Sequence, residues 1–117
     1  RLAMSHLSIL PTVLRDEIVL AQALRDLGLE PLPAGVLKGF AAEREAVCLR
    51  VMLPEGLQIG WRRQADGSLA LVGDLQRLAR SRSVQQLIGR ITRHYAAHQA
   101  LQSAQRELPG ASVALTV

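Results

Sequence analysis

Three histidines are the residues of this chain that could most directly do chemistry. His94 and His98 stand four positions apart, which brings both imidazole rings to one face of a helix, as in helices that bind zinc. A metal site needs a third and a fourth ligand, and no Glu or Cys near them in the sequence offers one. His98 also falls within an apolar stripe, and His94 lies at its edge. This position favours packing or hydrogen bonding, so the sequence predicts no metal site. His6 lies in the first expected strand, as a polar anchor or, alternatively, as a catalytic group.

Nucleophilic and phosphate-binding motifs are missing from the sequence. No serine lies in a Gly-x-Ser-x-Gly turn, and no base accompanies Cys48, the single cysteine. Cys48 stands in an apolar run, so we interpret it as a small buried hydrophobic residue that forms no intrachain disulfide. The glycines are spread over strands and turns instead of preceding a helix, as a phosphate-binding loop requires. We therefore expect no catalytic residue and no cofactor, and an enzyme is the class that the sequence favours least.

Arginine is the residue type that suggests a partner. The chain has 14 Lys and Arg against 10 Asp and Glu, a net charge of +4, and Lys38 is its only lysine. Guanidinium groups bind carboxylates and phosphates through two parallel hydrogen bonds, which suits an anionic partner. A base-composition bias of the genome is the alternative explanation, because Ala, Leu and Gly are also abundant. The candidate partner-binding residues are Arg50, Arg62, Arg63, Arg80, Arg82, Arg90 and Arg93.

A predicted β-hairpin over residues 57–74 positions the first group of arginines. Two runs of alternating apolar residues flank an Asp-Gly pair, which is the sequence form of a hairpin. If Trp61 faces the core, Arg62 points the other way, and the same alternation in the preceding strand turns Arg50 outward. We predict that these two arginines share an exposed sheet face, with Arg63 at the hairpin tip.

A predicted long helix positions the second group. The hydrophobic period becomes helical at Ser83, which we expect to form a capping box with Gln86, and it continues to about Glu107. Its apolar side includes Ile91 and Tyr95. The arginines on its polar side and along its approach are Arg77, Arg80, Arg82, Arg90 and Arg93.

The remaining elements complete a small α+β domain. A strand over residues 5–10, ended by Pro11, precedes a helix that Asp16 caps and Gly28 ends. Further strands are expected over residues 36–40, 46–53 and 113–117, with a polar turn at 43–45. This order of elements predicts a two-layer sandwich, in which a mostly antiparallel sheet of five to six strands carries two helices on one face, related to the ferredoxin-like fold.

The length and termini define the extent of the domain. A chain of 117 residues forms one domain, which we place at residues 4–117. Residues 1–3 precede Met4 and are either a cloning remnant or an upstream-start extension. No segment approaches the ~18 uninterrupted apolar residues of a membrane span. The beginning of the chain lacks the pattern of a secretion signal, so we expect a cytoplasmic protein.

Several short segments together resemble one known family. They are MSHLS at 4–8, ALRDLG at 23–28, IGW at 59–61, LALVGD at 69–74 and RHYAAH at 93–98. Together they resemble the hypothetical chloroplast reading frame thirty-five family of cyanobacteria and algal plastids, a domain family of unknown function. The resemblance covers most of the chain, implies a cytoplasmic or stromal protein of an oxygenic phototroph, and supplies no catalytic residue.

Three functional hypotheses follow from these patterns. The first is a non-catalytic binding module, an adaptor or assembly factor that docks an acidic protein surface through its arginines. The second is RNA or DNA binding through the same arginines, although three aromatic residues in the whole chain give little means of stacking bases. The third is an enzyme or small-ligand binder that uses His6, His94 or His98.

Overall fold

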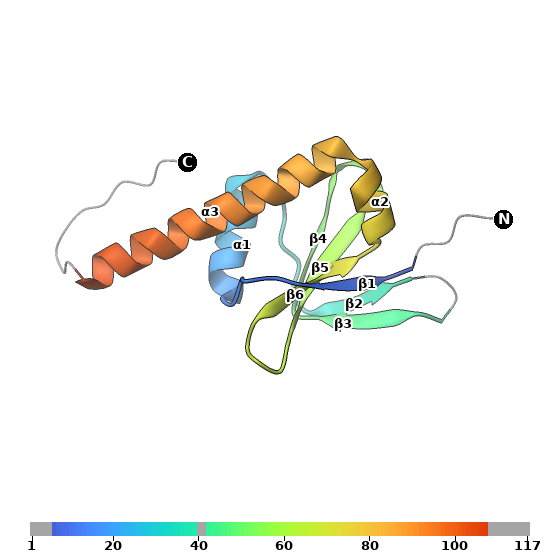
Figure 1. Ribbon diagram of the computed structural model, residues 1–117, viewed down its shortest axis with the longest axis horizontal. Coiled ribbons are helices and arrows are strands. Elements are labelled where there is room, and N and C mark those ends of the chain that lie inside the picture. The colour runs from blue at the N-terminus through green and yellow to red at the C-terminus, as the bar shows by residue number, and fades with distance from the viewer. Residues whose placement is uncertain (1–5, 40–41, 108–117) are drawn as a thin grey trace.

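A computed structural model shows a small α+β protein and describes residues 6–39 and 42–107 (Figure 1). The strands are β1 (Ser8–Pro11), β2 (Gly35–Lys38), β3 (Arg44–Val47), β4 (Leu49–Met52), β5 (Gln58–Arg63) and β6 (Leu69–Gly73). The helices are α1 (Glu17–Asp26), α2 (Leu75–Arg80) and α3 (Arg82–Glu107), and a 3-10 turn, η1 (Pro54–Gly56), joins β4 to β5. The predicted strand over 113–117 lies outside the described residues, as does Phe40.

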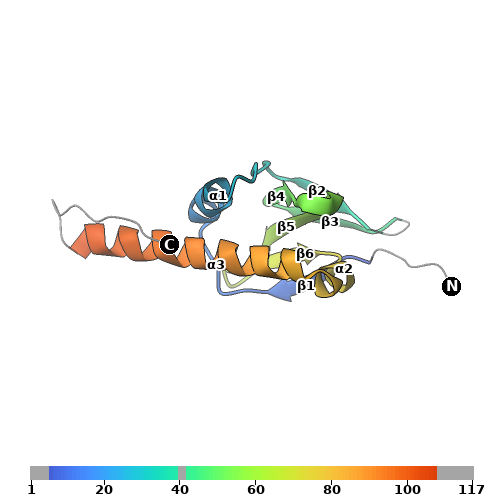
Figure 2. The same ribbon diagram turned by 90° about the horizontal axis from the view of Figure 1, so that it is seen from above.

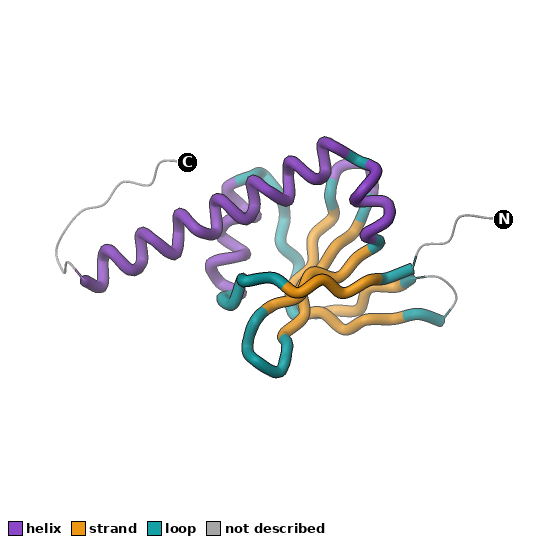
Figure 3. Tube along the Cα trace, viewed as in Figure 1, coloured by secondary structure: helices purple, strands orange, loops and turns teal. Residues whose placement is uncertain are grey.

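The predicted α+β sandwich with antiparallel strands is confirmed. Four strands form one antiparallel sheet in the order β1-β6-β5-β4, and β2 and β3 form a separate two-stranded antiparallel sheet. Figure 3 shows the helices gathered on one side of the strands. Apolar side chains of the sheet pack there against buried residues of α1 and α3; they are Leu49 and Val51 of β4, Ile59 and Trp61 of β5, and Leu69 and Leu71 of β6. The predicted hairpin is the pair of strands β5 and β6.

None of the described helices is both long enough and apolar enough to cross a membrane.

Trp61 faces the helices, as predicted. Its side chain is 2 % exposed and belongs to the main core. In the sheet register Trp61 is paired with Leu49, and Arg50 is paired with Gly60. Since successive residues of a strand point to opposite faces, Arg50 and Arg62 share the other face of the sheet, as the alternation predicted.

Much of that second face is covered, which corrects the prediction for Arg50 and Arg62, although the side chain of Arg62 is still 38 % exposed. The β2–β3 ribbon packs over it, and Val47 and Leu37 form a second small core with Val72, which is fully buried. A Cβ atom on Gly60 would lie 2.9 Å from Val47 Cγ1. Glycine at this position therefore lets the ribbon approach the sheet closely.

The single strand predicted over residues 46–53 is two strands that belong to different sheets. The chain passes from β3 to β4 at Cys48, whose backbone N–H donates to the carbonyl of Trp61 at 2.8 Å. Residues 43–45 were expected as a turn, yet Arg44 and Glu45 lie within β3. Alternating hydrophobicity is the same on both sides of such a corner, so the pattern does not reveal the change of sheet.

β1 ends at Pro11, as predicted, with the proline as its last residue. β1 is an edge strand of the four-stranded sheet. The neighbouring Thr12 directs its N–H toward Leu69 O at 3.3 Å, so the nitrogen of Pro11 points away from β6. A proline is tolerated at such an outward position of an edge strand, because no ladder hydrogen bond is lost.

The predicted caps of α1 are confirmed. Asp16 Oδ1 accepts hydrogen bonds from the backbone N–H groups of Ile18 at 2.9 Å and Val19 at 3.1 Å. At the other end, Gly28 adopts a left-handed φ of 76°, and Leu29 donates its N–H to Leu24 O at 3.0 Å. This six-residue closure is a Schellman motif, for which glycine is the preferred residue.

The start of α3 differs from the predicted capping box. Ser81 caps the helix through its Oγ, which accepts from the N–H of Val84 at 3.3 Å. Ser83 instead lies inside the helix, and its hydroxyl donates to Glu55. The short helix α2 was not predicted; Asp74 caps it by accepting from the N–H of Arg77 at 3.2 Å.

α1 and α3 are tied together by a buried tyrosine. Tyr95 on α3 is 7 % exposed, and its hydroxyl oxygen accepts from the backbone N–H groups of Arg15 and Asp16, both at 3.0 Å. This contact fixes the start of α1 against the middle of α3. The C-terminal end of α3 extends past the other elements (Figure 2).

Candidate functional site

The solvent side of α3 carries a shallow, open, basic surface depression that is formed by the side chains of this one helix. The depression is lined by Arg82, Gln85, Gln86, Gly89, Arg90 and Arg93. We call this surface the α3 groove.

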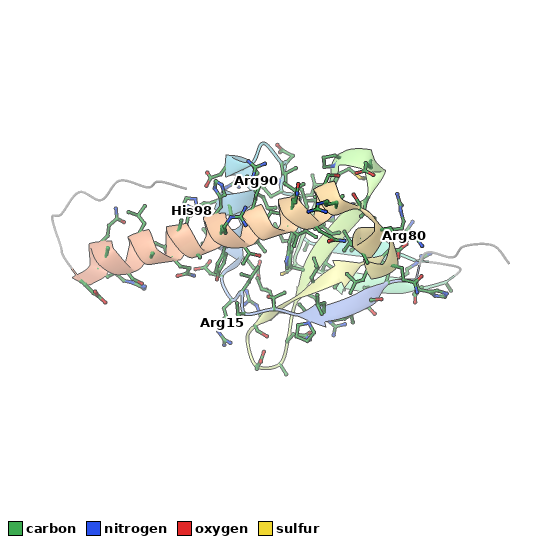
Figure 4. All side chains as sticks on the ribbon, turned by 45° about the horizontal axis from the view of Figure 1, so that its top comes forward. Arg15, Arg80, Arg90 and His98 are labelled. Atoms are coloured by element: carbon green, nitrogen blue, oxygen red, sulfur yellow. The ribbon has the colours of Figure 1, made fainter. Side chains whose placement is uncertain are left out.

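The arginines of the α3 groove have no ionic partner within the described part of the chain. Arg82, Arg90 and Arg93 are all exposed, and the ion pairs found among the described residues involve other side chains. Arg80, on α2, is likewise exposed and unpaired among those residues, and Figure 4 shows it beyond the start of α3, with Arg90 farther along that helix. Guanidinium groups without internal partners keep all their donors available for an anion.

Arg50 and Arg62 are held by contacts within the protein. Arg62 Nη1 lies 2.7 Å from Glu45 Oε1, which joins the sheet to the β2–β3 ribbon. Arg50 donates from Nε to the backbone carbonyl of Pro33 at 3.1 Å, and its guanidinium lies against Gly35. Both side chains thus fasten the ribbon to the second sheet face.

Arg63 is similarly engaged at the loop end of the hairpin, as predicted, where it is paired with Leu69. Its Nη1 donates to the carbonyls of Gly67, at 2.8 Å, and of Arg15. Its Nη2 lies 2.7 Å from Glu17 Oε1, in the first turn of α1. The candidate arginines therefore divide into a sheet group with internal partners and a helix group that faces solvent.

His94 and His98 share one carboxylate. Asp26 Oδ2 lies 2.6 Å from His98 Nε2 and 3.3 Å from His94 Nδ1. The rings are mostly buried between α1 and α3, and Figure 4 shows His98 on the α3 ribbon beside α1. Partial burial acts to raise the pKa of Asp26, but the hydrogen bonds from His98 and His94 outweigh it, so that this pKa is lowered. The three side chains form a polar tie between the two helices.

Asp26 was missed as a partner of the histidines, for which packing or hydrogen bonding was predicted. It lies in the last turn of α1, far from them in sequence, and no local pattern connects them. Within the described residues no cluster of three or more His, Cys, Asp and Glu side chains has the arrangement of a metal site. His6 has a separate environment before β1, where its Nδ1 lies 3.9 Å from Glu43 Oε2.

Cys48 is half-buried and packs against the main core. Its Sγ lies 3.2 Å from the carbonyl oxygen of Trp61, to which the thiol donates. Burial, followed by the nearby carboxylate of Glu17, raises the pKa of this thiol. A thiol with a raised pKa is a weak nucleophile at neutral pH.

Comparison with known proteins identifies a family. The family model described as "Protein of unknown function (DUF1257)" matches residues 23–114. The search of curated proteins and the search of solved structures gave no match. The matched segment begins within α1 and includes the whole sheet hairpin, the α3 groove and the polar tie between the helices. The expected membership of an uncharacterised domain family is thereby confirmed, and the chain belongs to the DUF1257 family.

Proposed function

We propose that this protein is a non-catalytic binding module, an adaptor or assembly factor that docks an acidic protein surface in the α3 groove. One observation carries the proposal. Arg82, Arg90 and Arg93 line a single groove on one helix, are exposed, and have no ionic partner among the described residues. Three uncompensated guanidinium groups on a rigid element attract an anionic surface during encounter and pair with its carboxylates after contact.

The contrast with the other arginines supports this choice of surface. Arg62 and Arg63 have carboxylate partners at 2.7 Å, so an incoming acidic partner would have to compete with Glu45 and Glu17. At the arginines of the α3 groove, an acidic partner would not have to displace a carboxylate of the protein itself. The proposed docking surface therefore comprises the helix group, with Arg80 at its edge, and the sheet group contributes to folding.

The family resemblance supports a cellular setting for this role. We propose that the protein works in the cytoplasm, or the equivalent plastid compartment, of an oxygenic phototroph. Its partner there is a protein whose contacting surface is rich in Asp and Glu.

A pull-down from a lysate of the source cells tests the proposal. The test variant is Arg82→Glu/Arg90→Glu/Arg93→Glu, and the matched control is Arg25→Glu/Lys38→Glu/Arg44→Glu, three exposed cations outside the groove. Each replacement changes the charge by two, so both variants go from +4 to −2. We expect an acidic protein to be captured by the wild type and the control and to be lost from the test variant. A set of captured proteins that is the same for all three baits contradicts the proposal.

Nucleic-acid binding is the competing outcome of the same experiment. Phosphate contacts release counterions, so such binding weakens steeply as salt increases. If the captured material disappears after nuclease treatment, and the purified protein shifts single-stranded RNA or duplex DNA in a gel at low salt, the partner is a nucleic acid. The proposal of a protein partner is then wrong.

A further inference from the structure

The α3 groove contains a glycine that the fold itself does not require. Gly89 lies within a helix of 26 residues, and glycine is the weakest helix former after proline. Its backbone stays out of the left-handed region that favours glycine. A Cβ atom built on it would meet only Arg93 Nη1, at 3.4 Å, which is the far end of a flexible side chain. Neither conformation nor packing within the described structure therefore explains the glycine.

The missing side chain leaves the helix backbone between the groove arginines covered only by the flexible guanidinium of Arg93. Arg82 lies seven residues before Gly89 and Arg93 four residues after it, which corresponds to about 10 Å and about 6 Å along the helix axis. A small residue on a helix surface lets another backbone approach closely, as at the crossing points of packed helices. The α3 groove thus contains a point where a partner's backbone can approach α3 closely, with arginines before and after it along the helix.

We propose that the occupant of the α3 groove is an acidic helix of a partner protein, which crosses α3 at Gly89. This inference rests on the proposed function and specifies the partner's shape. The partner helix presents a short side chain, such as alanine, at the crossing point, and Asp or Glu residues within two turns on either side. These carboxylates pair with Arg82, Arg90 and Arg93.

The position of Gly89 distinguishes this partner from a nucleic acid. A phosphate backbone is contacted by guanidinium groups, and such a contact gains nothing from the lack of a side chain at residue 89. A protein side chain that enters the groove gains packing contacts there, since close-packed surfaces exclude water and add dispersion energy.

Fluorescence anisotropy with two defined probes tests the inference. The first probe is a 21-residue alanine-rich helical peptide with glutamates on one face around a central alanine. The second is a disordered polyglutamate peptide of the same net charge. The protein variants are Gly89→Leu, which fills the groove without a change of charge, Gly89→Ala, and Arg82→Glu/Arg90→Glu/Arg93→Glu. Ala100→Leu, at an exposed position of α3 eleven residues beyond Gly89 and outside the groove lining, is the matched control.

We expect Gly89→Leu to weaken binding of the helical peptide by about tenfold or more and Gly89→Ala to weaken it less. Binding of the disordered peptide should be the same in both variants and the wild type, because it depends on charge alone. Ala100→Leu should bind both peptides as the wild type does. Thermal melting should show that neither Gly89 variant is less stable than the wild type, because leucine and alanine are both better helix formers than glycine.

The outcomes separate this inference from the proposed function. If the arginine variant loses both peptides but Gly89→Leu binds the helical peptide normally, the acidic-surface proposal stands and the helix inference is wrong. The helix inference alone is also wrong if the wild type binds the disordered peptide but not the helical one. If the arginine variant binds both peptides as the wild type does, or if the wild type binds neither, both proposals are wrong.

Discussion

Removal of one hydroxyl, in Tyr95→Phe, tests how α1 is fastened to α3. The Tyr95 oxygen accepts from the N–H groups of Arg15 and Asp16, both at 3.0 Å, and the ring is part of the main core. Phenylalanine keeps the ring but leaves both backbone donors without this acceptor. A buried donor without a partner costs about 1–3 kcal/mol. These two donors are only partly buried, which places each near the lower limit, so we expect a total loss of about 2 kcal/mol.

Urea denaturation followed by circular dichroism measures this loss. For a domain of this size, about 2 kcal/mol corresponds to a fall in melting temperature of roughly 8 °C. Gln99→Ala is the matched control, because Gln99 Nε2 contacts the same hydroxyl at 3.1 Å but its removal leaves both backbone donors bound to Tyr95. The control should lose at most about 0.5 kcal/mol. If Tyr95→Phe is as stable as the control, the hydroxyl does not hold α1 in place.

Four further predictions concern the core, the ribbon, the helix tie and the thiol. Trp61→Ala should lower the free energy of unfolding by about 3–5 kcal/mol in urea titrations, because it empties the largest side chain of the core. Gly60→Ala should cost about 1–3 kcal/mol in the same assay, since its methyl group would overlap Val47 on the covering ribbon; an unchanged stability would mean that the ribbon does not pack on Gly60. Folding lowers the pKa of Asp26 below its ordinary value of 3.8. The carboxylate of Asp26 therefore contributes fully to stability above pH 3.8, and this contribution is lost as the pH falls through the lower pKa of the folded protein. The stability difference between the wild type and Asp26→Asn should therefore shrink below about pH 4, and a difference that grows there would contradict the assignment. Cys48 should react with a disulfide reagent at pH 8 at least about tenfold more slowly in the folded protein than in urea, and equal rates would show that its thiol is neither shielded nor raised in pKa.

The local elements could be predicted because their signals lie within a few residues. Asp16 and Gly28 mark the ends of α1 through caps that need only neighbouring backbone groups. The alternation along β5 assigned Trp61 and Arg62 to opposite faces, and the structure agrees. The predicted placement of arginines along α3 likewise needed only the helical period. Prediction was less successful at Ser83, because the choice between Ser81 and Ser83 as the cap of α3 depends on contacts with the distant Glu55.

What covers each face was decided by the tertiary structure alone. The hydrophobic period shows which side of a helix or strand is apolar, but it does not show which distant segment of the chain packs against that side. The corner at Cys48 brings β2 and β3 over the second sheet face. Arg50 and Arg62 stay partly exposed, but they are engaged there by the carbonyl of Pro33 and the carboxylate of Glu45. Asp26 meets the two histidines in the same way, across a separation that no sequence window spans. The sequence by itself determined the helices, the hairpin and the arginine content. Only the packing of distant segments determined which arginines remained available, because an ion pair or a covering ribbon depends on where both partners lie in space.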